Sequence, residues 1–481
     1  MLMKTFKLTL LAVAVASLVS PLSAHAADTL FDNFTPLNSS AGPIPVGGAG
    51  EATPITLSSP NFTQVSIADR NTHLAQGQGD SGNWDMITAN ETGPNAGRYL
   101  FMPYETGTGG VQRIDLHDPN YNTRTTTIVK PGTQNFVAGD ASRWTPWGTY
   151  LTAEESWSDP AQATSPYGRM FEVTNPTTAG INGGNFEHRK IGPADIRVSH
   201  EGLAFDAANN FYFIDERNDS HIFRFASANP NATNGADFFG AGVTSVLRVG
   251  DGSVEEATGA YSWVALTDLA GNALAGTVVK TDPNGMSVLD GRATPNQSLF
   301  LGTNFDRPED LEIQTLEDGK QKLYVATTTN NKVFALDLAN NEIKLFASQA
   351  SKDLATGSTA GSGFSSPDNL AIDSENNIYI IEDRNGGEDD DIWFAKDLNK
   401  DGDLLDAGEG LARWASNGTQ GSEFTGLYFD KFNSNVAYVN IQHPTSGNDR
   451  TMQINAVPVP GAVWLFGSAI AGMIGLRRSK A

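Results

Sequence analysis

Acidic side chains recur where short apolar segments of this sequence begin or end. Segment ends carry Glu105, Glu154, Glu155, Asp215, Glu216, Glu382, Asp383, Gln442 and His443, and segment starts carry His200, Glu201, Arg307, Glu309, Asp368 and Asn369. Any one of these acids could be an ordinary solvated loop residue. If the segment ends meet, however, the carboxylates would repel one another and could not all stay ionised without a counter-charge. We therefore expect bound cations, and oxygen donors with few histidines favour Ca²⁺, Mn²⁺ or ferric iron over Zn²⁺.

A second acidic stretch, DLNKDGDLLDAGEG at 397–410, resembles part of a calcium-binding loop. Asp397, Asn399 and Asp401 alternate with other residues, and a glycine that permits a tight turn follows. An EF-hand loop has its last acid at the twelfth position, whereas Glu409 occupies the thirteenth. The likeness is therefore limited to the first half of the loop. We predict calcium binding by Asp397, Asn399 and Asp401, with an ordinary acidic loop as the alternative.

The elements that must position these acids form an internal repeat. In each copy an apolar strand is followed by a polar turn and a second strand rich in aromatic residues, at 203–216, 311–328, 370–383 and 427–442. Weaker copies end at Glu105 and Glu155. Alternating apolar residues separated by Asn, Asp or Gly turns are typical of β-hairpins. Most copies lie about 50 to 60 residues apart, and one interval is about twice as long, which is near the period of a propeller blade.

We predict an all-β fold, a β-propeller of six blades with loop insertions. The long interval leaves room for an insertion or a degenerate extra blade at 229–297. A parallel β-helix is the alternative, but its repeat is much shorter. In a propeller the innermost strands converge on one axis, and we expect the strands that end in acids to be these inner strands. Glu154, Glu201, Glu309 and Asp368 should then share one axial site.

The two ends of the chain differ in composition from the body at 27–456. Residues 1–26 combine two lysines, an apolar run and a triplet of small residues around His25, which is typical of a cleaved signal peptide. Residues 457–481 contain an apolar stretch and then a basic cluster, long enough to span a bilayer. This tail resembles a PEP-CTERM sorting signal, with Val-Pro-Val-Pro-Gly in place of Pro-Glu-Pro, and a plain membrane anchor is the alternative. The resemblance implies processing by an exosortase, transient anchoring in the inner membrane, and export to the cell envelope or the outside.

The charge balance argues against several classes of function. The chain has 32 Lys and Arg against 55 Asp and Glu, a formal net charge of −23, so it is not expected to bind nucleic acid or an anionic membrane. It has no cysteine, which excludes disulfides, thiolate nucleophiles and thiolate-bound metals. Hydrophobic residues make up 39% of the chain, enough for a substantial core.

Five motifs carry a resemblance to a known family. They are TPWGTYLTAEE at 145–155, HEGLAFD at 200–206, RPEDLEI at 307–313, PDNLAID at 367–373 and AYVNIQHP at 437–444. In this order they are similar to motifs of the PhoX-type alkaline phosphatases, a family of secreted β-propeller enzymes with iron and calcium at the propeller axis. The resemblance implies that Glu154, Glu201 and Glu309 bind metal. It also implies that Asp368 lies near the metals and that Arg307 faces the phosphate of a phosphate-ester substrate.

These considerations assign a role to each candidate residue. The candidate catalytic residues are Arg307, Glu309 and Glu201, the candidate substrate-binding residues are Arg307 and His443, and the candidate metal ligands are Glu154, Glu201, Glu309, Asp368, Glu382, Asp383, Asp397, Asn399 and Asp401. One departure from the family matters, because the family pattern has an iron-binding cysteine where this chain has Ala153. Alanine cannot bind a metal. The sequence therefore leaves two functions open, a secreted metal-dependent phosphatase and a non-catalytic calcium-binding propeller of the cell surface or matrix.

Overall fold

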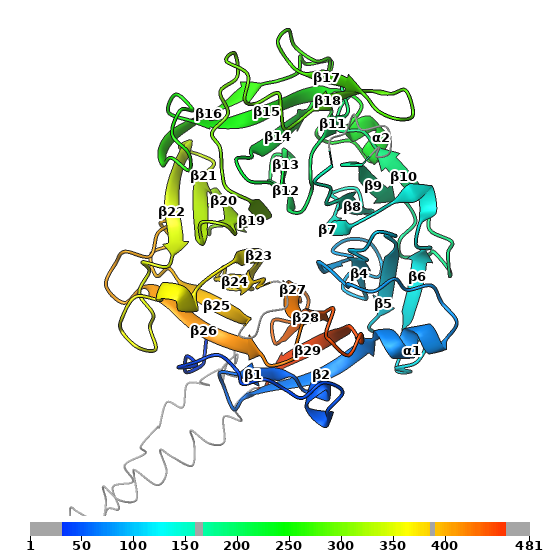
Figure 1. The fold of residues 1–481 in the computed structure, drawn as a ribbon, viewed down its shortest axis with the longest axis vertical. Coiled ribbons are helices and arrows are strands. Elements are labelled where there is room, and N and C mark those ends of the chain that lie inside the picture. The colour runs from blue at the N-terminus through cyan, green and yellow to red at the C-terminus, as the bar shows by residue number, and fades with distance from the viewer. Residues whose placement is uncertain (1–30, 159–166, 385–389, 458–481) are drawn as a thin grey trace, which may run out of the picture. The chain divides into compact units, whose positions relative to one another are not determined.

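Six antiparallel blades of β-strands surround a central axis in the computed structural model, which describes residues 31–158, 167–384 and 390–457 (Figure 1). The alternation of apolar side chains along the strands produces this arrangement, because each blade can bury both faces against its two neighbours. The prediction of an all-β propeller with six blades is confirmed.

Each blade starts with its innermost strand and continues outward along the chain. Blade 1 contains β3 (Thr88–Ala89), β4 (Tyr99–Pro103), β5 (Val111–Asp115) and β6 (Thr125–Val129). Blade 2 contains β7 (Gly139–Trp144), β8 (Tyr150–Glu154), β9 (Met170–Val173) and β10 (Phe186–Arg189). Blade 3 contains β12 (Leu203–Phe205), β13 (Phe211–Ile214), β14 (Ile222–Ser227) and β15 (Gly242–Val249).

The second half of the ring repeats this order. Blade 4 contains β19 (Pro308–Thr315), β20 (Gln321–Thr327), β21 (Lys332–Asp337) and β22 (Glu342–Ser348). Blade 5 contains β23 (Pro367–Ile372), β24 (Ile378–Glu382), β25 (Asp391–Lys396) and β26 (Gly410–Asn417). Blade 6 contains β27 (Glu423–Phe429), β28 (Val436–Gln442) and β29 (Arg450–Ala456).

Two strands from the start of the described chain complete the last blades. β2 (Phe62–Asp69) pairs with β29 and becomes the fourth strand of blade 6. β1 (Ile55–Leu57) pairs with β26 at the outer edge of blade 5. A short helix, α1 (Arg70–Ala75), then leads toward blade 1. Blade 6 therefore combines strands from both ends of the body, which closes the ring between the first and last blades.

The long interval between two repeat copies holds an insertion and not an additional blade. Within it, α2 (Gly235–Phe238) precedes β15, and β16 (Gly259–Ala265) pairs with both β15 and β22, which joins blades 3 and 4 into one nine-stranded sheet. β17 (Val279–Thr281) and β18 (Ser287–Asp290) form a separate three-stranded sheet with β11 (Ile196–Arg197). The alternative of a degenerate extra blade is wrong.

The hydrophobic core consists of six apolar clusters, and each lies between two neighbouring blades. Between blades 5 and 6, for example, the ring centroids of Tyr379 and Trp414 lie 5.3 Å apart and those of Tyr379 and Phe429 lie 4.5 Å apart. The Trp414 indole N–H donates to the carbonyl oxygen of Phe31. Burial of these faces is the main stabilising contribution to the ring.

The predicted signal peptide at 1–26 and the predicted sorting tail at 457–481 lie outside the described residues, apart from Val457. Within the described chain, no helix has both the length and the apolar character needed to cross a membrane.

Two glycines allow the inner strands of neighbouring blades to approach each other. A Cβ atom at Gly202 would lie 2.4 Å from the backbone nitrogen of Leu311 and 2.7 Å from the Asp310 carbonyl carbon. At Gly426, where φ is +60°, a Cβ atom would lie 2.4 Å from the backbone nitrogen of Ile87. Both contacts are with backbone atoms, which cannot rotate away, so a side chain here would push two blades apart.

We expect Gly202→Ala to destabilise the propeller by about 3 kcal/mol or more, because the added methyl group overpacks a backbone contact. Gly180→Ala is the matched control, since a Cβ atom there meets nothing within 4 Å. Thermal melting followed by circular dichroism would measure both variants. Equal melting temperatures for the two variants would contradict the close approach of blades 3 and 4.

Candidate functional site

The first two strands of each blade bring their acidic residues to one end of the axis. Because the strands are antiparallel, the start of the first lies beside the end of the second: Gly139 pairs with Glu154, Pro308 with Thr327, Pro367 with Glu382 and Glu423 with Gln442. The innermost strands are β7, β12, β19, β23 and β27 (Figure 1), and β3 starts blade 1. The expectation that the strands ending in acids are innermost is wrong, because the chain enters each blade at the axis and those strands come second.

A repeated turn precedes the inner strands. The residue two places before the axial acid has a positive φ in five blades, namely Asn83, Ala138, Arg307, Ser366 and Gly421, and Ser199 holds this place in blade 3. In each of the first five blades, the carbonyl oxygen of this turn residue accepts a hydrogen bond of 2.8 to 3.0 Å from a backbone N–H shortly after the second strand. The donors are Glu105, Glu155, Glu216, Thr328 and Asp383. In blade 6 the side chain of His443 makes the equivalent contact. The turn therefore fixes two side chains per blade beside the axis.

β-Bulges follow this turn in several blades. The pairing register shifts between Gly139 and Ser142, between Pro308 and Leu311, and between Pro367 and Leu370. The bulged segments contain Asp140, Glu309 and Asp368 respectively. A bulge turns a side chain away from its regular direction along the strand, and in these blades it accompanies an acid that lines the axis.

The result is an acid-lined cavity of about 200 Å³ on the axis, which we call the axial cavity. Each blade contributes one acid from the start of its inner strand: Asp85, Asp140, Glu201, Glu309, Asp368 and Glu423. Four further acids follow second strands: Glu105, Glu155, Glu216 and Asp383. Arg307 and His443 are the basic residues of the lining. Of the predicted site residues, the structure thus brings together Glu201, Arg307, Glu309, Asp368, Asp383 and His443.

Two groups of carboxylates in the axial cavity are close enough to hold metal ions. Glu201, Glu309 and Asp368 form one group, and Glu105, Asp140 and Glu155 form the other. Within each group the potential ligand oxygens lie within 4.8 Å of one another. All of these donors are carboxylate oxygens, which suit hard cations.

The electrostatics of the axial cavity indicate that a counter-charge is needed. Burial raises the pKa of Glu201 well above its usual range, and the neighbouring carboxylates of Asp368 and Glu309 raise it further. Burial raises the pKa of Asp140 in the same way, and that of Asp85 to about 7. Oδ1 of Asp140 and Oε2 of Glu309 are buried without a hydrogen-bond partner among the described residues, while Oε1 of Glu309 lies in an ion pair with Arg307. Such oxygens require either protons or cations, and the donor set fits cations.

Arg307 contacts two of these acids. Its Nη2 donates to Oε1 of Glu216 at 2.6 Å, and its Nε lies 3.2 Å from Oε1 of Glu309. The carboxylates of Glu309 and Glu216 raise the pKa of the guanidinium above its usual value, against the effect of burial. Its φ of +54° is a conformation that side-chain-bearing residues rarely adopt. The fold therefore tolerates backbone strain at Arg307, and the strained conformation holds a permanent positive charge beside the acids.

His443 lies at the edge of the axial cavity in blade 6. Its Nδ1 is 2.8 Å from the carbonyl oxygen of Gly421, and its Nε2 is 2.7 Å from Oε1 of Glu423. A carbonyl oxygen can only accept, so Nδ1 carries a hydrogen. The contact with Glu423 then places a hydrogen bond between the ring and this carboxyl group at the edge of the cavity.

The structure does not bring Glu154 and Glu382 to the axial cavity. Arg169 binds both carboxylate oxygens of Glu154, with Nη2 at 2.6 Å and Nε at 3.0 Å. Glu382 accepts from the Trp393 indole at 3.1 Å and from the Ser365 N–H at 2.7 Å. The expectation that Glu154 shares the axial site is wrong, because successive side chains of a strand point to opposite faces. The following residues, Glu155 and Asp383, face the cavity instead.

The loop at 397–410 is separate from the axial cavity. Asp397 accepts hydrogen bonds from the backbone of Asp401 and Gly402, and Oδ1 of Asn399 accepts from the backbone of Asp401. Lys344 forms ion pairs with Asp401 at 3.2 Å and with Asp403. Calcium binding by Asp397, Asn399 and Asp401 stays a prediction.

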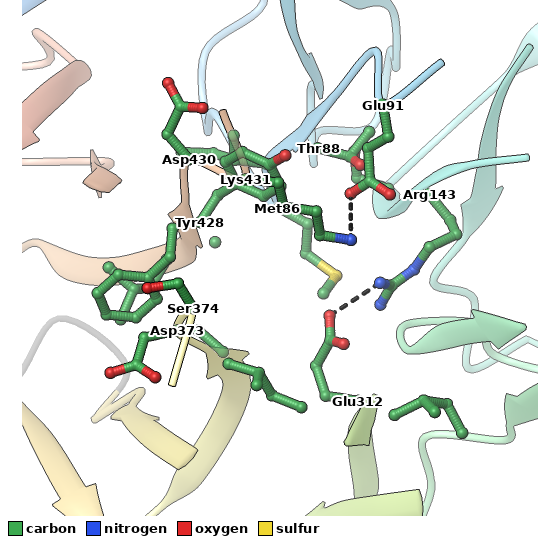
Figure 2. A pocket seen from close by; sticks show the side chains of 18 of the residues that line it. Met86, Thr88, Glu91, Arg143, Glu312, Asp373, Ser374, Tyr428, Asp430 and Lys431 are labelled. Carbon is green, nitrogen blue, oxygen red and sulfur yellow. Dashed lines mark hydrogen bonds and ion pairs between the residues drawn. The ribbon is translucent and has the colours of Figure 1, made fainter. Parts of the chain in front are cut away.

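A second cavity, of about 320 Å³, lies where the inner strands end, at the opposite end of the axis (Figure 2). Its charged side chains include two ion pairs, Arg143 with Glu312 at 2.8 Å and Lys431 with Glu91 at 2.7 Å. Figure 2 shows both pairs spanning the cavity. The two ends of the axis therefore differ: both basic residues at this end are paired with acids, with Asp373 and Asp430 as further acids, whereas ten carboxylates meet two basic residues at the other end.

Sequence reasoning missed Asp85, Asp140 and Glu423 as lining residues. Their signal is positional, since each stands where Glu309 and Asp368 stand in the clearer copies, two residues after the turn residue. Aligning all six inner-strand starts would have found them. Trp157, which contacts Glu155 and Glu216, carries no repeat signal and could not be found in this way.

Comparisons with known proteins identify similar sequences and folds. The family model described as alkaline phosphatase PhoX matches residues 87–445. A solved structure of Pseudomonas fluorescens PhoX in complex with vanadate, a transition state analogue, is similar with a TM-score of 0.58 and 16% identity, over 89% of this chain and 98% of that chain. A luciferin-regenerating enzyme matches with a TM-score of 0.43 and 10% identity, over 82% of this chain and 95% of that one. No curated protein sequence matches significantly.

We expect Ca²⁺ to raise the melting temperature of the protein and chelation by EDTA to lower it, because cations bind the folded acids and relieve their repulsion. In Glu155→Gln the rise should be at most half as large, since one ligand group loses its charge. In Glu154→Gln the melting temperature should fall equally with and without Ca²⁺, because Arg169 is left buried and unpaired. Differential scanning calorimetry with and without Ca²⁺ measures all three proteins. A full Ca²⁺ response in Glu155→Gln would contradict the assignment of Glu155 to the cation group.

Proposed function

This chain belongs to the alkaline phosphatase PhoX family, and from that premise we propose that it hydrolyses phosphate monoesters in its axial cavity with the help of bound cations. The main support for the proposal is the ring of six acids, one from each blade, with the guanidinium group of Arg307 beside them. In the reaction, water adds to phosphorus, the bond from phosphorus to the alcohol oxygen breaks, and phosphate and an alcohol are released.

The chain's own residues supply positioning and charge. Glu201, Glu309 and Asp368, with Glu105, Asp140 and Glu155, would hold the cations. When bound, such cations polarise phosphoryl oxygens and make water more acidic. Arg307 offers a planar guanidinium, which can engage two phosphoryl oxygens at once. Because Glu216 and Glu309 already hold the guanidinium in place, little reorganisation is needed when the substrate binds.

Calcium is the cation we propose first, and Mn²⁺ or iron would also accept these oxygen donors. Ala153 bears on the choice. It is completely buried and packs in the apolar cluster with Ala141, Leu151 and Met170, so the chain supplies no thiolate at the position of the family's cysteine. This substitution favours a second candidate function, a calcium-binding surface or matrix propeller without catalysis.

The ends of the chain bear on where the protein acts. We propose export through the predicted signal peptide at 1–26, exosortase processing of the tail at 457–481, and a final location in the cell envelope or outside the cell. The sequence pattern of each segment supports these proposals. Mass spectrometry of the two ends of the natural protein tests both cleavages.

We expect Arg307→Lys to lower kcat/KM for p-nitrophenyl phosphate at alkaline pH about 10- to 100-fold, because a lysine cannot engage two phosphoryl oxygens in a bidentate contact. Lys431→Ala, at the opposite end of the axis, is the control and should keep the activity. The melting temperature and its Ca²⁺ response should remain near those of the natural protein, since the charge is kept.

Assays of the natural protein with Ca²⁺, Mn²⁺ and iron separate the two candidate functions. Hydrolysis that depends on a cation supports the phosphatase. Calcium binding without hydrolysis under any of these cations would reject the phosphatase and leave the non-catalytic propeller in its place.

A further inference from the structure

The rim of the axial cavity carries an aromatic side chain that the proposed chemistry does not use. Trp157 follows β8, and 42% of its surface is exposed. The side chain of Arg292, which comes from the insertion at 229–297, donates hydrogen bonds to the carbonyl oxygens of Ser156 and Ser158 on either side of it. Arg292 is itself fixed by Asp215, whose Oδ1 lies 3.1 Å from its Nε. The insertion thus anchors the segment that carries Trp157.

Trp157 is directly connected to the lining of the axial cavity. Its indole N–H lies 3.0 Å from Oε1 of Glu155 and 3.0 Å from Oε2 of Glu216, two acids from neighbouring blades. Two guanidinium groups lie over its ring, that of Arg307 at 5.4 Å and that of Arg217 at 5.6 Å from the ring centroid. Both distances are in the range of cation–π attraction. Trp157 therefore links the acids, Arg307 and a second arginine at the rim.

The two arginines differ in how their charge is balanced. Arg307 donates to Glu216 and lies against Glu309. Arg217 donates through Nη1 to the carbonyl oxygen of Trp157 at 3.1 Å, and among the residues at 31–158, 167–384 and 390–457 no carboxylate forms an ion pair with it. The backbone N–H of Arg307 donates to the carbonyl oxygen of Arg217, so the two residues are tied together. Arg217 therefore presents, beside Arg307, a positive charge that no carboxylate of the described residues pairs with.

We propose that Arg217 and Trp157 form an outer subsite that selects phosphate monoesters whose leaving group carries a second anionic group, a phosphate or a carboxylate. This inference rests on the proposed function, since it places the phosphoryl group at Arg307. Trp157 contacts Glu155 and Glu216 of the cavity lining, and both arginines lie over its ring, so a leaving group that extends from Arg307 past Trp157 brings its second anion to the Arg217 guanidinium. A guanidinium held against an aromatic ring is suited to paired contacts with carboxylate or phosphate oxygens.

Two substrates that differ in one group test the subsite. 3-Phosphoglycerate has a carboxylate where glycerol 3-phosphate has a hydroxymethyl group. We expect the ratio of kcat/KM for 3-phosphoglycerate to that for glycerol 3-phosphate to fall about tenfold in Arg217→Gln, with the loss mainly in KM, as one charge-assisted contact would give. Arg224→Gln is the matched control, because Arg224 also lies over a tryptophan, at 5.0 Å from the Trp263 ring centroid, on the outer strand β14. An unchanged ratio in Arg217→Gln, or an equal fall in Arg224→Gln, would overturn the proposal.

Binding measurements keep this test separate from the test of catalysis. If the protein hydrolyses neither ester, the proposed function fails, and isothermal titration calorimetry with the same two esters still decides on the subsite. Tighter binding of 3-phosphoglycerate that is lost in Arg217→Gln supports it. Equal affinity for the two esters, or no binding of either, refutes it.

Discussion

The repulsion among six carboxylates, one from each blade, is the constraint on which the rest of this structure depends. Asp85, Asp140, Glu201, Glu309, Asp368 and Glu423 meet in a cavity of about 200 Å³. Taken alone, such a ring is a cost to folding, because each buried carboxylate is unfavourable and its neighbours increase the penalty. The six apolar clusters between blades must outweigh this cost in the cation-free protein. Bound cations would relieve the repulsion among these carboxylates, so the site is suited to holding them.

The fold produces this ring with one repeated device. A turn residue, usually with positive φ, precedes each inner strand. Its carbonyl oxygen accepts a hydrogen bond from a residue at the end of the second strand. Two side chains per blade are thereby aimed at the axis, and substitution within this frame sets the local chemistry. Blade 4 has Arg307 at the turn and Thr328 after the second strand, whereas blade 2 has Ala138 and Glu155. The same backbone thus carries a cation in one blade and an additional acid in another.

Much of this arrangement could be predicted from the sequence. The period of the repeat gave the number of blades, and the acids at the starts of the clear copies, Glu201, Glu309 and Asp368, do meet at the axis. Without the strand boundaries, the sequence does not show which acid of an adjacent pair points to the axis. Glu154 and Glu155, for example, differ only in the face of the sheet to which their side chains point. Trp157 and Arg292 could not be predicted, since neither belongs to a repeat and Arg292 binds the carbonyl oxygens of Ser156 and Ser158 more than a hundred residues away.

The charges differ between the two ends of the axis, and this difference explains why the candidate site lies at one end. At the far end, Arg143 pairs with Glu312 and Lys431 with Glu91, so two of the four acids that line that cavity have a basic partner from the chain itself. At the acidic end, ten carboxylates meet only Arg307 and His443, so the remaining charge must be balanced by protons or by bound cations. Anomalous X-ray diffraction from crystals of the protein grown with Ca²⁺ or Mn²⁺ tests for bound cations most directly. We expect anomalous density between Glu201, Glu309 and Asp368 and between Glu105, Asp140 and Glu155. Cation density confined to the loop at 397–410, with none in the axial cavity, would contradict this expectation.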